Sequence, residues 1–529
     1  MTIADEFSWM ENLEDPKLIE WISEENRKIR RFVADYSDSL YKRILNYLNY
    51  PSILMLRATL KGLFTLVREY GTYKIYLMKN NGERIELVNA TELGENAILK
   101  YFYVSDDGNL LAYVYSFAGA DEGFVRIVNV DTGEQIDELK GVIGNIVFLG
   151  KNEYYYTRMF RTEKTPDGVQ PPTNRIFLRK NNEDFMVFGS GLETGYFVGI
   201  RGSKDKKKAL IMVSYGWGES SLYGGDLSKP DSWKKILEGK GYPVFPIEYM
   251  DGYYITILRD KDGLGRIVKV TEDGEIEELI DQQEFPLENA IVAGNKILAH
   301  YLVHASSILR IFDRNGRLIK EIKFDVPGTV RTIDAFNDEA IFTFESFWIP
   351  YKLIKINKNN EIEIIDSREI KGNFLINEKF VTSTDGTKIH IFIVKSKQTK
   401  KKKALIYGYG GFNISITPTY APMAIPFIQD GGTYVVANIR GGGEYGEKWH
   451  RAGMKDKKQN VFDDFASVIK RFKDDNYNVV AIGRSNGGLL VGAILTQHPE
   501  ILDGAVIGYP VLDMLRSVSY THLTLPTTE

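Results

Sequence analysis

A serine between glycines carries the sharpest chemical signal in the sequence. Gly483-Arg-Ser-Asn-Gly-Gly488 follows an apolar run and opens the helical run at residues 489–497. The glycines allow a strained turn to reverse the chain beneath the serine, so we expect the Ser485 hydroxyl to be exposed. It would lie at a helix N-terminus, where the helix dipole favours developing negative charge. We predict that Ser485 is a nucleophile; a glycine-rich loop that binds a phosphate, or nothing, is the alternative.

Two further glycine-rich turns follow other predicted strands. Gly408-Tyr-Gly-Gly-Phe-Asn413 comes after the apolar residues 404–407, and Arg440-Gly-Gly-Gly-Glu-Tyr-Gly446 comes after residues 434–438. A strand–turn–helix G-x-S-x-G is the nucleophile elbow of α/β-hydrolases, which also need backbone or side-chain donors for an oxyanion. The first turn is a candidate for those donors. Either turn alone could be a packing or flexible loop.

A serine nucleophile needs a general base, and α/β-hydrolases supply nucleophile, acid and histidine in that chain order. The six histidines are His300, His304, His390, His450, His498 and His522. Only the last comes late enough, yet it lies 37 positions after Ser485 (522 − 485), without room for a strand, the acid and a helix. Asp503 and Asp513 could replace the acid, but surface or packing positions explain them better.

The elements around these turns alternate between strands and helices. A hairpin is predicted around Asp385-Gly386, and the lysine run at 400–403 is predicted to be a solvated turn. Strands are predicted at residues 404–407, 434–438, 479–482 and 505–507, with an amphipathic helix at 460–472. Because Asp463 and Asp464 lie on this helix, we do not count them as acid candidates. The pattern predicts a buried parallel sheet with helices against it.

The stretch before this domain consists of short apolar and aromatic runs separated by turn pairs such as Asn81-Gly82 and Asp107-Gly108. Units begin near residues 55, 101, 146, 196, 244, 291 and 330, a period of roughly 45 residues. Charged outer pairs are predicted at residues 126–130 with 135–139, 267–270 with 276–279, 309–312 with 318–322, and 353–356 with 362–366. This period predicts a seven-bladed β-propeller. A pair of β-sandwiches would not repeat so regularly.

The first fifty residues are predicted to be helical. Asp15-Pro16 offers a helix cap followed by a first-turn proline. Trp9 and Trp21 are expected to anchor this arm to a larger body.

Composition limits the classes of protein that remain. The 529 residues contain no cysteine, which excludes disulfides, zinc–thiolate sites and a cysteine nucleophile. Lys+Arg 67 against Asp+Glu 71 gives a net charge of −4, which does not favour nucleic-acid binding. The sequence begins without a signal peptide, and no apolar run approaches the length of a membrane span. We therefore expect a cytoplasmic protein with no membrane partner, no nucleic-acid partner and no cofactor.

Together the three turns resemble those of the prolyl oligopeptidase family of serine peptidases. The resemblance also includes Lys458-Gln-Asn460, residues 462–465 and residues 511–516, and is strongest over 375–516. It implies two domains, a seven-bladed β-propeller capping an α/β-hydrolase domain, with the N-terminal arm packed on the hydrolase domain. The expected divisions are 1–52 for the arm, 53–370 for the propeller, 371–516 for the hydrolase domain and 517–529 for a non-native tail.

The resemblance also implies roles for five residues. Ser485 is the nucleophile, while the Tyr409 hydroxyl and the Asn486 backbone N–H form the oxyanion hole. Phe412 and Val511 wall a flat, apolar pocket for a proline ring. The implied reaction is cleavage of short peptides on the carboxyl side of proline through an acyl-enzyme, by a monomer without metal or cofactor.

The last residues do not fit this pattern. After Leu515-Arg516 the resemblance stops, and residues 518–527 resemble the translation of an adapter used in sequencing libraries. We expect a truncated reading frame, an incomplete hydrolase domain and a triad Asp and His beyond Arg516. As written, the chain should lack normal peptidase turnover and should fold poorly. An acylaminoacyl or dipeptidyl peptidase is the alternative enzyme, and a non-catalytic propeller scaffold is the alternative outside enzymes.

Overall fold

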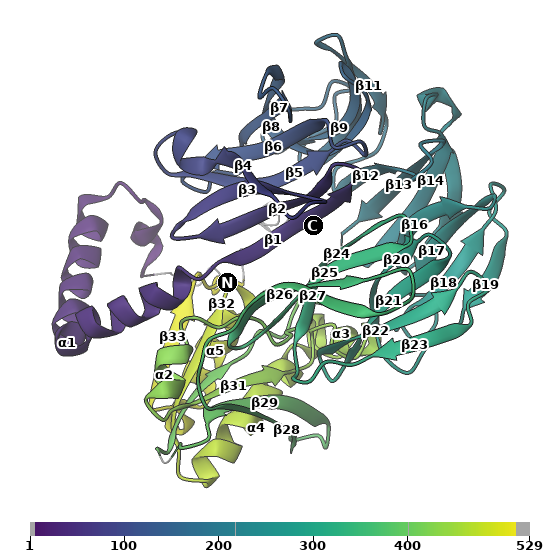
Figure 1. Cartoon of the computed structure of the whole chain (residues 1–529). Helices are drawn as coiled ribbons and strands as arrows, with labels where there is room; N and C mark the ends of the chain where they lie inside the picture. Colours follow the sequence, from purple (N-terminus) through teal and green to yellow (C-terminus); the bar gives the residue numbers. More distant parts are fainter. Residues whose placement is uncertain (1–5, 217, 400, 515–529) are drawn as a thin grey trace.

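The computed structural model describes residues 6–216, 218–399 and 401–514. Within these ranges, hairpins from residue 52 to residue 368 form seven blades, and a mixed sheet with helices follows them in the chain (Figure 1). The yellow-green sheet lies below the blades in this view, and the purple helix α1 (Pro16–Leu48) projects to the side. The predicted two-domain architecture of propeller and α/β-hydrolase is confirmed.

Each blade pairs its strands antiparallel in chain order. The first three blades comprise β1 (Ser52–Thr59), β2 (Gly62–Glu69), β3 (Thr72–Lys79), β4 (Arg84–Asn89), β5 (Ala97–Val104), β6 (Leu110–Phe117), β7 (Gly123–Asn129), β8 (Gln135–Gly150), β9 (Glu153–Phe160), β10 (Thr173–Lys180) and β11 (Glu183–Phe188). The other four comprise β12 (Tyr196–Gly202), β13 (Lys208–Tyr215), β14 (Glu219–Asp226), β15 (Lys234–Glu238), β16 (Val244–Met250), β17 (Tyr253–Leu258), β18 (Arg266–Val270), β19 (Ile276–Ile280), β20 (Leu287–Ala293), β21 (Lys296–Val303), β22 (Ser306–Asp313), β23 (Leu318–Ile322), β24 (Thr329–Phe336), β25 (Glu339–Ser346), β26 (Ile349–Ile356) and β27 (Ile362–Arg368). All four predicted outer pairs are present.

One long strand belongs to two blades. The first part of β8 pairs with β7, ending with Gly141 opposite Gly123, and its second part pairs with β9 from Val142 onward. The second and third blades therefore form one continuous seven-stranded sheet. No turn pair separates the two halves of this strand in the sequence, which explains why the chain runs straight through.

The first and last blades share no strand, because each is built from its own contiguous segment. The ring is therefore closed by side-chain contacts between these two blades. Leu56 and Leu63 of the first blade pack with Ile341, Tyr351 and Leu353 of the last. Polar contacts reinforce this seam.

A carboxylate at the seam receives two hydrogen bonds. Asp334 of β24 accepts from Arg57 Nη1 at 3.0 Å and from the Ala58 backbone N–H at 2.8 Å. Residues from the first strand of every blade line a central cavity of about 300 Å³, which lies on the propeller axis.

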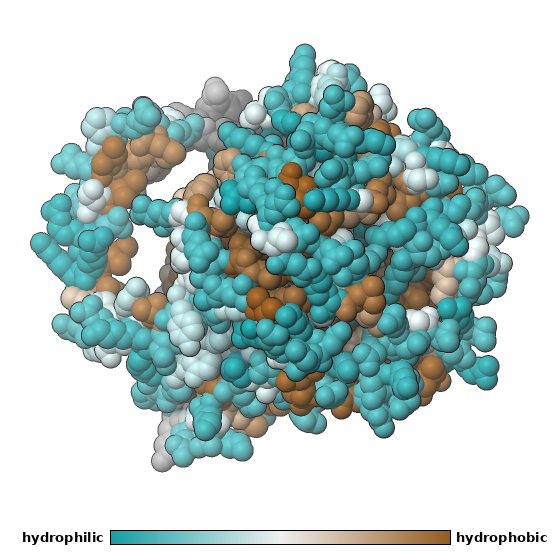
Figure 2. Space-filling view, turned by 45° about the horizontal axis from the view of Figure 1, so that its top comes forward, coloured by the Kyte–Doolittle hydropathy of each residue, from teal (hydrophilic) through white to brown (hydrophobic). Residues whose placement is uncertain are grey.

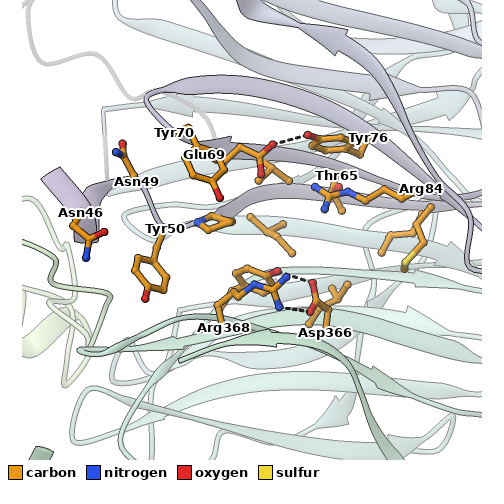
Figure 3. A pocket seen from close by; sticks show the side chains of 17 residues that line it. Asn46, Asn49, Tyr50, Thr65, Glu69, Tyr70, Tyr76, Arg84, Asp366 and Arg368 are labelled. Carbon is orange, nitrogen blue, oxygen red and sulfur yellow. Dashed lines mark hydrogen bonds and ion pairs between the residues drawn. The ribbon is translucent and has the colours of Figure 1, made fainter. Parts of the chain in front are cut away.

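A second cavity, of about 460 Å³, lies between the first and last blades beside the end of α1. Figure 3 shows Tyr76 directed at Glu69 on one wall, and Arg368 beside Asp366 on the other. The cavity is lined by propeller residues and by the end of the arm, and none of the residues predicted to be catalytic contributes to it.

The second domain is a six-stranded sheet in the order β28-β29-β31-β30-β32-β33. Its strands are β28 (Phe374–Thr382), β29 (Lys388–Ser396), β30 (Lys403–Tyr407), β31 (Thr433–Asn438), β32 (Asn478–Arg484) and β33 (Gly504–Gly508). The last four strands run parallel, so their carboxyl ends share one edge. In such sheets ligands bind outside the carboxyl ends of the strands.

Helices cover this sheet, and their apolar side chains pack against its strands to form the core of the domain. They are α2 (Ile425–Gln429), α3 (Glu447–Arg451), α4 (Gln459–Asp474) and α5 (Asn486–Gln497). The predicted amphipathic helix at 460–472 is confirmed as α4, whose Val461 and Phe465 are fully buried in the core.

The N-terminal helix is capped as predicted. Asp15 accepts a hydrogen bond from the Lys17 N–H at 2.8 Å, and Pro16 begins the helix. Only Leu18 is buried along α1. The expected anchoring by Trp21 is wrong, because its side chain is 46% exposed. Figure 2 shows the arm projecting from the body with apolar residues on its surface.

The end of this helix contacts the hydrolase domain. Arg43 donates to both carboxylate oxygens of Asp430, at 2.8 and 3.0 Å, just beyond α2. Tyr47 donates through its hydroxyl to Gln429 at 2.9 Å, and the Tyr420 hydroxyl donates to the Tyr47 carbonyl. These contacts fix the last turns of α1 and leave its first half exposed.

The propeller also meets the hydrolase domain directly. The ring of His304, from the turn between β21 and β22, stacks on His390 of β29 with the ring centres 5.5 Å apart. His304 Nδ1 lies 3.2 Å from the Tyr445 hydroxyl, and Thr329 donates to the Pro418 carbonyl at 2.7 Å. Among the described residues, no helix is long and apolar enough to cross a membrane.

Candidate active site

The serine turn joins β32 to α5. Ser485 has φ 54° and ψ −119°, a left-handed conformation that non-glycine residues rarely adopt. Its backbone N–H donates to the Gly508 carbonyl at 2.9 Å, and its side chain is exposed. A Cβ at Gly483 would overlap the Gly487 carbonyl, so the turn requires glycine there. The strained φ and the exposed hydroxyl are the geometry expected of a nucleophile elbow.

The turn after β30 lies against the serine. The Tyr409 hydroxyl lies close enough to the Ser485 side chain to interact with it. Burial raises the pKa of this phenol above its ordinary value, and the serine contact partly offsets that rise. A neutral phenol can donate a hydrogen bond to an oxyanion.

Asn486 is the first residue of α5, so its backbone N–H has no acceptor within the helix. Its side chain is buried, and its Nδ2 donates to the Tyr409 carbonyl at 2.5 Å. The three residues predicted for nucleophile and oxyanion hole, Ser485, Tyr409 and Asn486, are therefore brought together, although 76 positions separate Tyr409 from Ser485 (485 − 409).

A lysine that the sequence reasoning did not assign to the site joins this group. Lys458 Nζ donates to the Gly410 carbonyl at 2.9 Å and to Asn486 Oδ1 at 3.0 Å. Burial lowers the pKa of this ammonium to about 8. Lys458 belongs to a stretch quoted for the family resemblance, and this was the only signal for it in the sequence.

The third glycine-rich turn is held by a buried ion pair. Arg440 donates through Nε and Nη2 to Asp464 at 2.9 and 2.5 Å, and its backbone N–H donates to the same carboxylate. Asp464 is fully buried and also accepts from Ser383. On the other side, Arg440 Nη1 donates to Asp385 at 2.5 Å and lowers the pKa of that carboxyl to about 2. Asp464 thus serves the packing of this turn.

A second buried carboxyl lies within that turn. Glu444 accepts from the Ile416 backbone N–H at 2.8 Å, and burial raises its pKa to about 7. Asn438 Nδ2 donates to the Ile416 carbonyl, and Asn438 Oδ1 accepts from His390 Nδ1 at 2.9 Å. These contacts hold residues 414–418 against the third turn.

A cavity of about 690 Å³ opens beside the serine turn. Phe412 and Asn486 line it, together with Lys458 and His450. Phe412 has φ 57° and is 37% exposed. Val511, predicted to wall the same pocket as Phe412, lies after β33, is 39% exposed, and does not line this cavity.

Each described histidine has a partner other than Ser485. The pairs are His300 with Ser307, His304 with Tyr445, His390 with Asn438 and Glu378, His450 with Glu447, and His498 with Glu500. His498 ends α5, as expected of a surface cap. Asp503 is paired with Lys473 at 2.7 Å. His522 and the tail at 517–529 lie outside the described residues.

The propeller, the parallel sheet and the three turns define a propeller-capped α/β-hydrolase with a serine elbow. Two family models match the chain: the prolyl oligopeptidase N-terminal beta-propeller domain at residues 1–368, and the prolyl oligopeptidase family at residues 418–529. The chain belongs to the prolyl oligopeptidase family, a family of serine peptidases. The second match includes residues 517–529, for which a non-native tail was expected.

Similar proteins agree with this assignment. The chain is 28% identical to a prolyl endopeptidase of Elizabethkingia meningoseptica, over 98% of this chain and 78% of that protein. It is 27% identical to a prolyl endopeptidase of Dictyostelium discoideum, over 97% and 81%. A structure from a study of two prolyl endopeptidases superposes with a TM-score of 0.88 at 24% identity, over 97% of this chain and 80% of that one.

Proposed function

We propose that the chain is a serine endopeptidase that cleaves short peptides on the carboxyl side of proline through an acyl-enzyme on Ser485. The observation that carries the proposal is the convergence of the Ser485 and Tyr409 hydroxyls and the first N–H of α5. Ser485 Oγ attacks the prolyl carbonyl, and the oxyanion accepts from Tyr409 and Asn486. Two such donors supply several kcal/mol of transition-state stabilisation, about 3–4 kcal/mol for each donor.

The reaction has two steps, acylation of Ser485 and hydrolysis of the acyl-enzyme. The C–O bond to Ser485 forms and the scissile C–N bond breaks, the leaving nitrogen takes up the proton given up by the Ser485 hydroxyl, and the acyl group remains on Ser485 as an ester. Water then hydrolyses that ester and restores the hydroxyl. The preference for proline is supported by the names of the similar proteins, which are prolyl endopeptidases, and by Phe412 at the edge of the cavity beside Asn486.

We infer further that the chain as written lacks ordinary turnover, because the five described histidines are engaged elsewhere and none of them activates Ser485. The part of the chain that the structure describes then supplies no histidine to Ser485, and His522 lies outside that part. A serine without its histidine keeps only the oxyanion hole and substrate binding.

An activated ester tests the nucleophile separately from turnover. 4-Nitrophenyl acetate transfers its acetyl group to Ser485 and releases 4-nitrophenolate, a leaving group that needs no proton from an acid. We expect intact-mass spectrometry to detect one acetyl group on the purified chain and none on Ser485→Ala. Equal acetylation of both proteins would overturn the proposal.

A matched pair of peptides tests the specificity and the missing base. A peptide with proline at the scissile position should slow the acetylation more than its alanine analogue. Neither peptide should be hydrolysed at ordinary enzyme rates. Prolyl hydrolysis that disappears in Ser485→Ala would keep the nucleophile and overturn the inference about the base.

The non-catalytic scaffold is the second candidate function, and the same engaged histidines favour it. A chain that is not acetylated at Ser485 but binds peptides through its propeller would support the scaffold.

We also propose that the chain is cytoplasmic, in keeping with the absence of cysteine, and that it is a monomer. Light scattering after size-exclusion chromatography should give the mass of one chain, 60.3 kDa.

A further inference from the structure

We propose that Lys458 is a positioning residue that locks the oxyanion turn, Gly408-Tyr-Gly-Gly-Phe-Asn413, onto the serine elbow. The inference deepens the proposed function and rests on Ser485 as its nucleophile. It assigns a task to a lysine that touches neither the Ser485 hydroxyl nor the reacting carbonyl, and that acts through the two groups it holds.

Three hydrogen bonds form a closed connection between three segments. Lys458 Nζ donates to the Gly410 carbonyl and to Asn486 Oδ1, while Asn486 Nδ2 donates to the Tyr409 carbonyl. Two consecutive carbonyls of the turn are therefore held, one by α5 and one by the start of α4. With both carbonyls fixed, the Tyr409 hydroxyl stays directed at Ser485.

The same contacts set the orientation of Asn486. A primary amide has one acceptor oxygen and two donor hydrogens, and here Lys458 occupies the oxygen while the Tyr409 carbonyl occupies a hydrogen. Lys458 can only donate, so the amide cannot turn over without losing both bonds. The first residue of α5, whose backbone N–H faces the oxyanion position, is thereby fixed by its own side chain.

A purely structural role in capping α4 does not explain this lysine. Lys458 is the residue before the first turn of α4, yet its side chain makes no capping hydrogen bond to that helix. Within the described ranges, no carboxylate lies within 4.0 Å of its Nζ, whereas Lys473, at the other end of α4, is paired with Asp503. Burying a cation without a counter-ion disfavours folding, so a packing role alone would be better served by an uncharged residue.

The uncompensated charge also has an effect on the chemistry. A positive charge in a partly buried site favours negative charge that develops nearby, and hydrogen bonds from an ionised donor are stronger than neutral ones. The ammonium is bound to Asn486, which supplies one oxyanion donor, and to Gly410, which follows the residue that supplies the other. It therefore both orients those donors and makes the surrounding potential more positive.

Lys458→Met and Lys458→Arg separate these roles from general stability. Methionine keeps the length of the side chain without donors or charge, and arginine restores both. Lys470→Met, at an exposed position on the same helix, is the matched control. All four proteins would be acetylated with 4-nitrophenyl acetate, and hydrogen exchange would be measured by mass spectrometry in peptides that cover residues 407–413.

We expect Lys458→Met to lower the rate of Ser485 acetylation 10- to 100-fold and to accelerate exchange in residues 407–413, with little change in the thermal midpoint. Lys458→Arg should recover most of the rate, and Lys470→Met should behave as the unaltered chain. Acetylation and exchange unchanged in Lys458→Met would overturn the proposal.

The two measurements also distinguish failure of the inference from failure of the function. If Ser485→Ala and the unaltered chain are acetylated equally, the proposed nucleophile is wrong, and the exchange data still decide whether Lys458 holds the turn. If Lys458→Met loses structure throughout the chain, Lys458→Leu, which also lacks donors and charge, repeats the comparison. Exchange in that folded variant equal to that of the unaltered chain would overturn the role of Lys458.

Discussion

Asn486 uses its backbone and its side chain for different purposes. Its N–H begins α5 beside Ser485, and its amide group connects the Tyr409 carbonyl to Lys458. A substitution that moves this side chain by a few tenths of an ångström therefore changes the oxyanion hole without touching the nucleophile. Misplacement of catalytic groups on this scale lowers rates strongly, because the donors must match the transition state.

Gly411→Ala is predicted to lower the rate of Ser485 acetylation by about 10-fold or more. A Cβ at position 411 would lie 2.6 Å from Asn486 Nδ2, so the amide must move and release the Tyr409 carbonyl. The measurement is the acetylation rate by intact mass. Gly150→Ala is the control, because a Cβ there meets nothing within 4 Å. An unchanged rate in Gly411→Ala would argue against this coupling.

At the scale of elements, α4 connects two of the three glycine turns. Lys458, the residue just before the helix, holds the turn after β30, and Asp464, about two turns further along, holds Arg440 after β31. The apolar face of the helix, including Val461 and Phe465, is buried against the sheet. One helix therefore sets the distance between the oxyanion turn and the turn that follows β31.

Asp464→Ala is predicted to destabilise the hydrolase domain by about 3–5 kcal/mol, because it leaves Arg440 buried without its main partner. Arg440 is 5% exposed, and Asp464 is fully buried. The change in the free energy of unfolding is measured by urea denaturation, with hydrogen exchange in peptides of this domain as the probe. Asp463→Ala, on the half-exposed face, should alter stability by less than about 0.5 kcal/mol. Equal effects of both substitutions would contradict the importance of the ion pair.

On the scale of the whole molecule, two of the contacts between distant segments involve ionisable side chains. Asp334 joins the last blade to the first, and the stacked rings of His304 and His390 join the propeller to the hydrolase domain. In neither contact do the two parts share a β-sheet. Because the contact between the domains includes His304, whose pKa is lowered, we expect the arrangement of the domains to depend on pH.

Lowering the pH from 7.5 to 5 is predicted to weaken the contact between the domains. Burial, followed by the charge of His390, lowers the pKa of His304 below 6.5. The neutral form is thus favoured in the contact, whose stabilisation is present above pH 6.5 and is lost as the pH falls toward the lowered value. Glu378, beside His390, and the Tyr445 hydroxyl also face this pair. Small-angle scattering should record a larger radius of gyration at pH 5.

His304→Gln is the control for this pH dependence. Glutamine keeps a polar side chain that can reach the Tyr445 hydroxyl but does not titrate. The radius of gyration of this variant should vary less between pH 7.5 and pH 5 than that of the unaltered chain. A radius that is independent of pH in both proteins would refute the prediction.

Much of the architecture could be predicted because its signals are local. The turn pairs and the roughly 45-residue period specify seven blades, since each hairpin is encoded by a few neighbouring residues. The serine turn identified Ser485 for the same reason, whereas the roles of Tyr409 and Asn486 were implied by the family resemblance. The shared strand β8 departs from the pattern because Lys140-Gly141 contains no tight turn, so the two blades remain joined.

The sequence by itself determined the blades and the strand–turn–helix around Ser485, because each depends on backbone preferences over a few positions, while the proposed roles of Tyr409 and Asn486 came from the family resemblance. Only the tertiary structure decided that Lys458 meets Asn486, that Asp464 binds Arg440, and that Trp21 is left exposed. These outcomes depend on the order of strands in the sheet and on the position of α4 against it. No local pattern encodes such contacts, since the residues that make them are brought together only when the whole sheet forms.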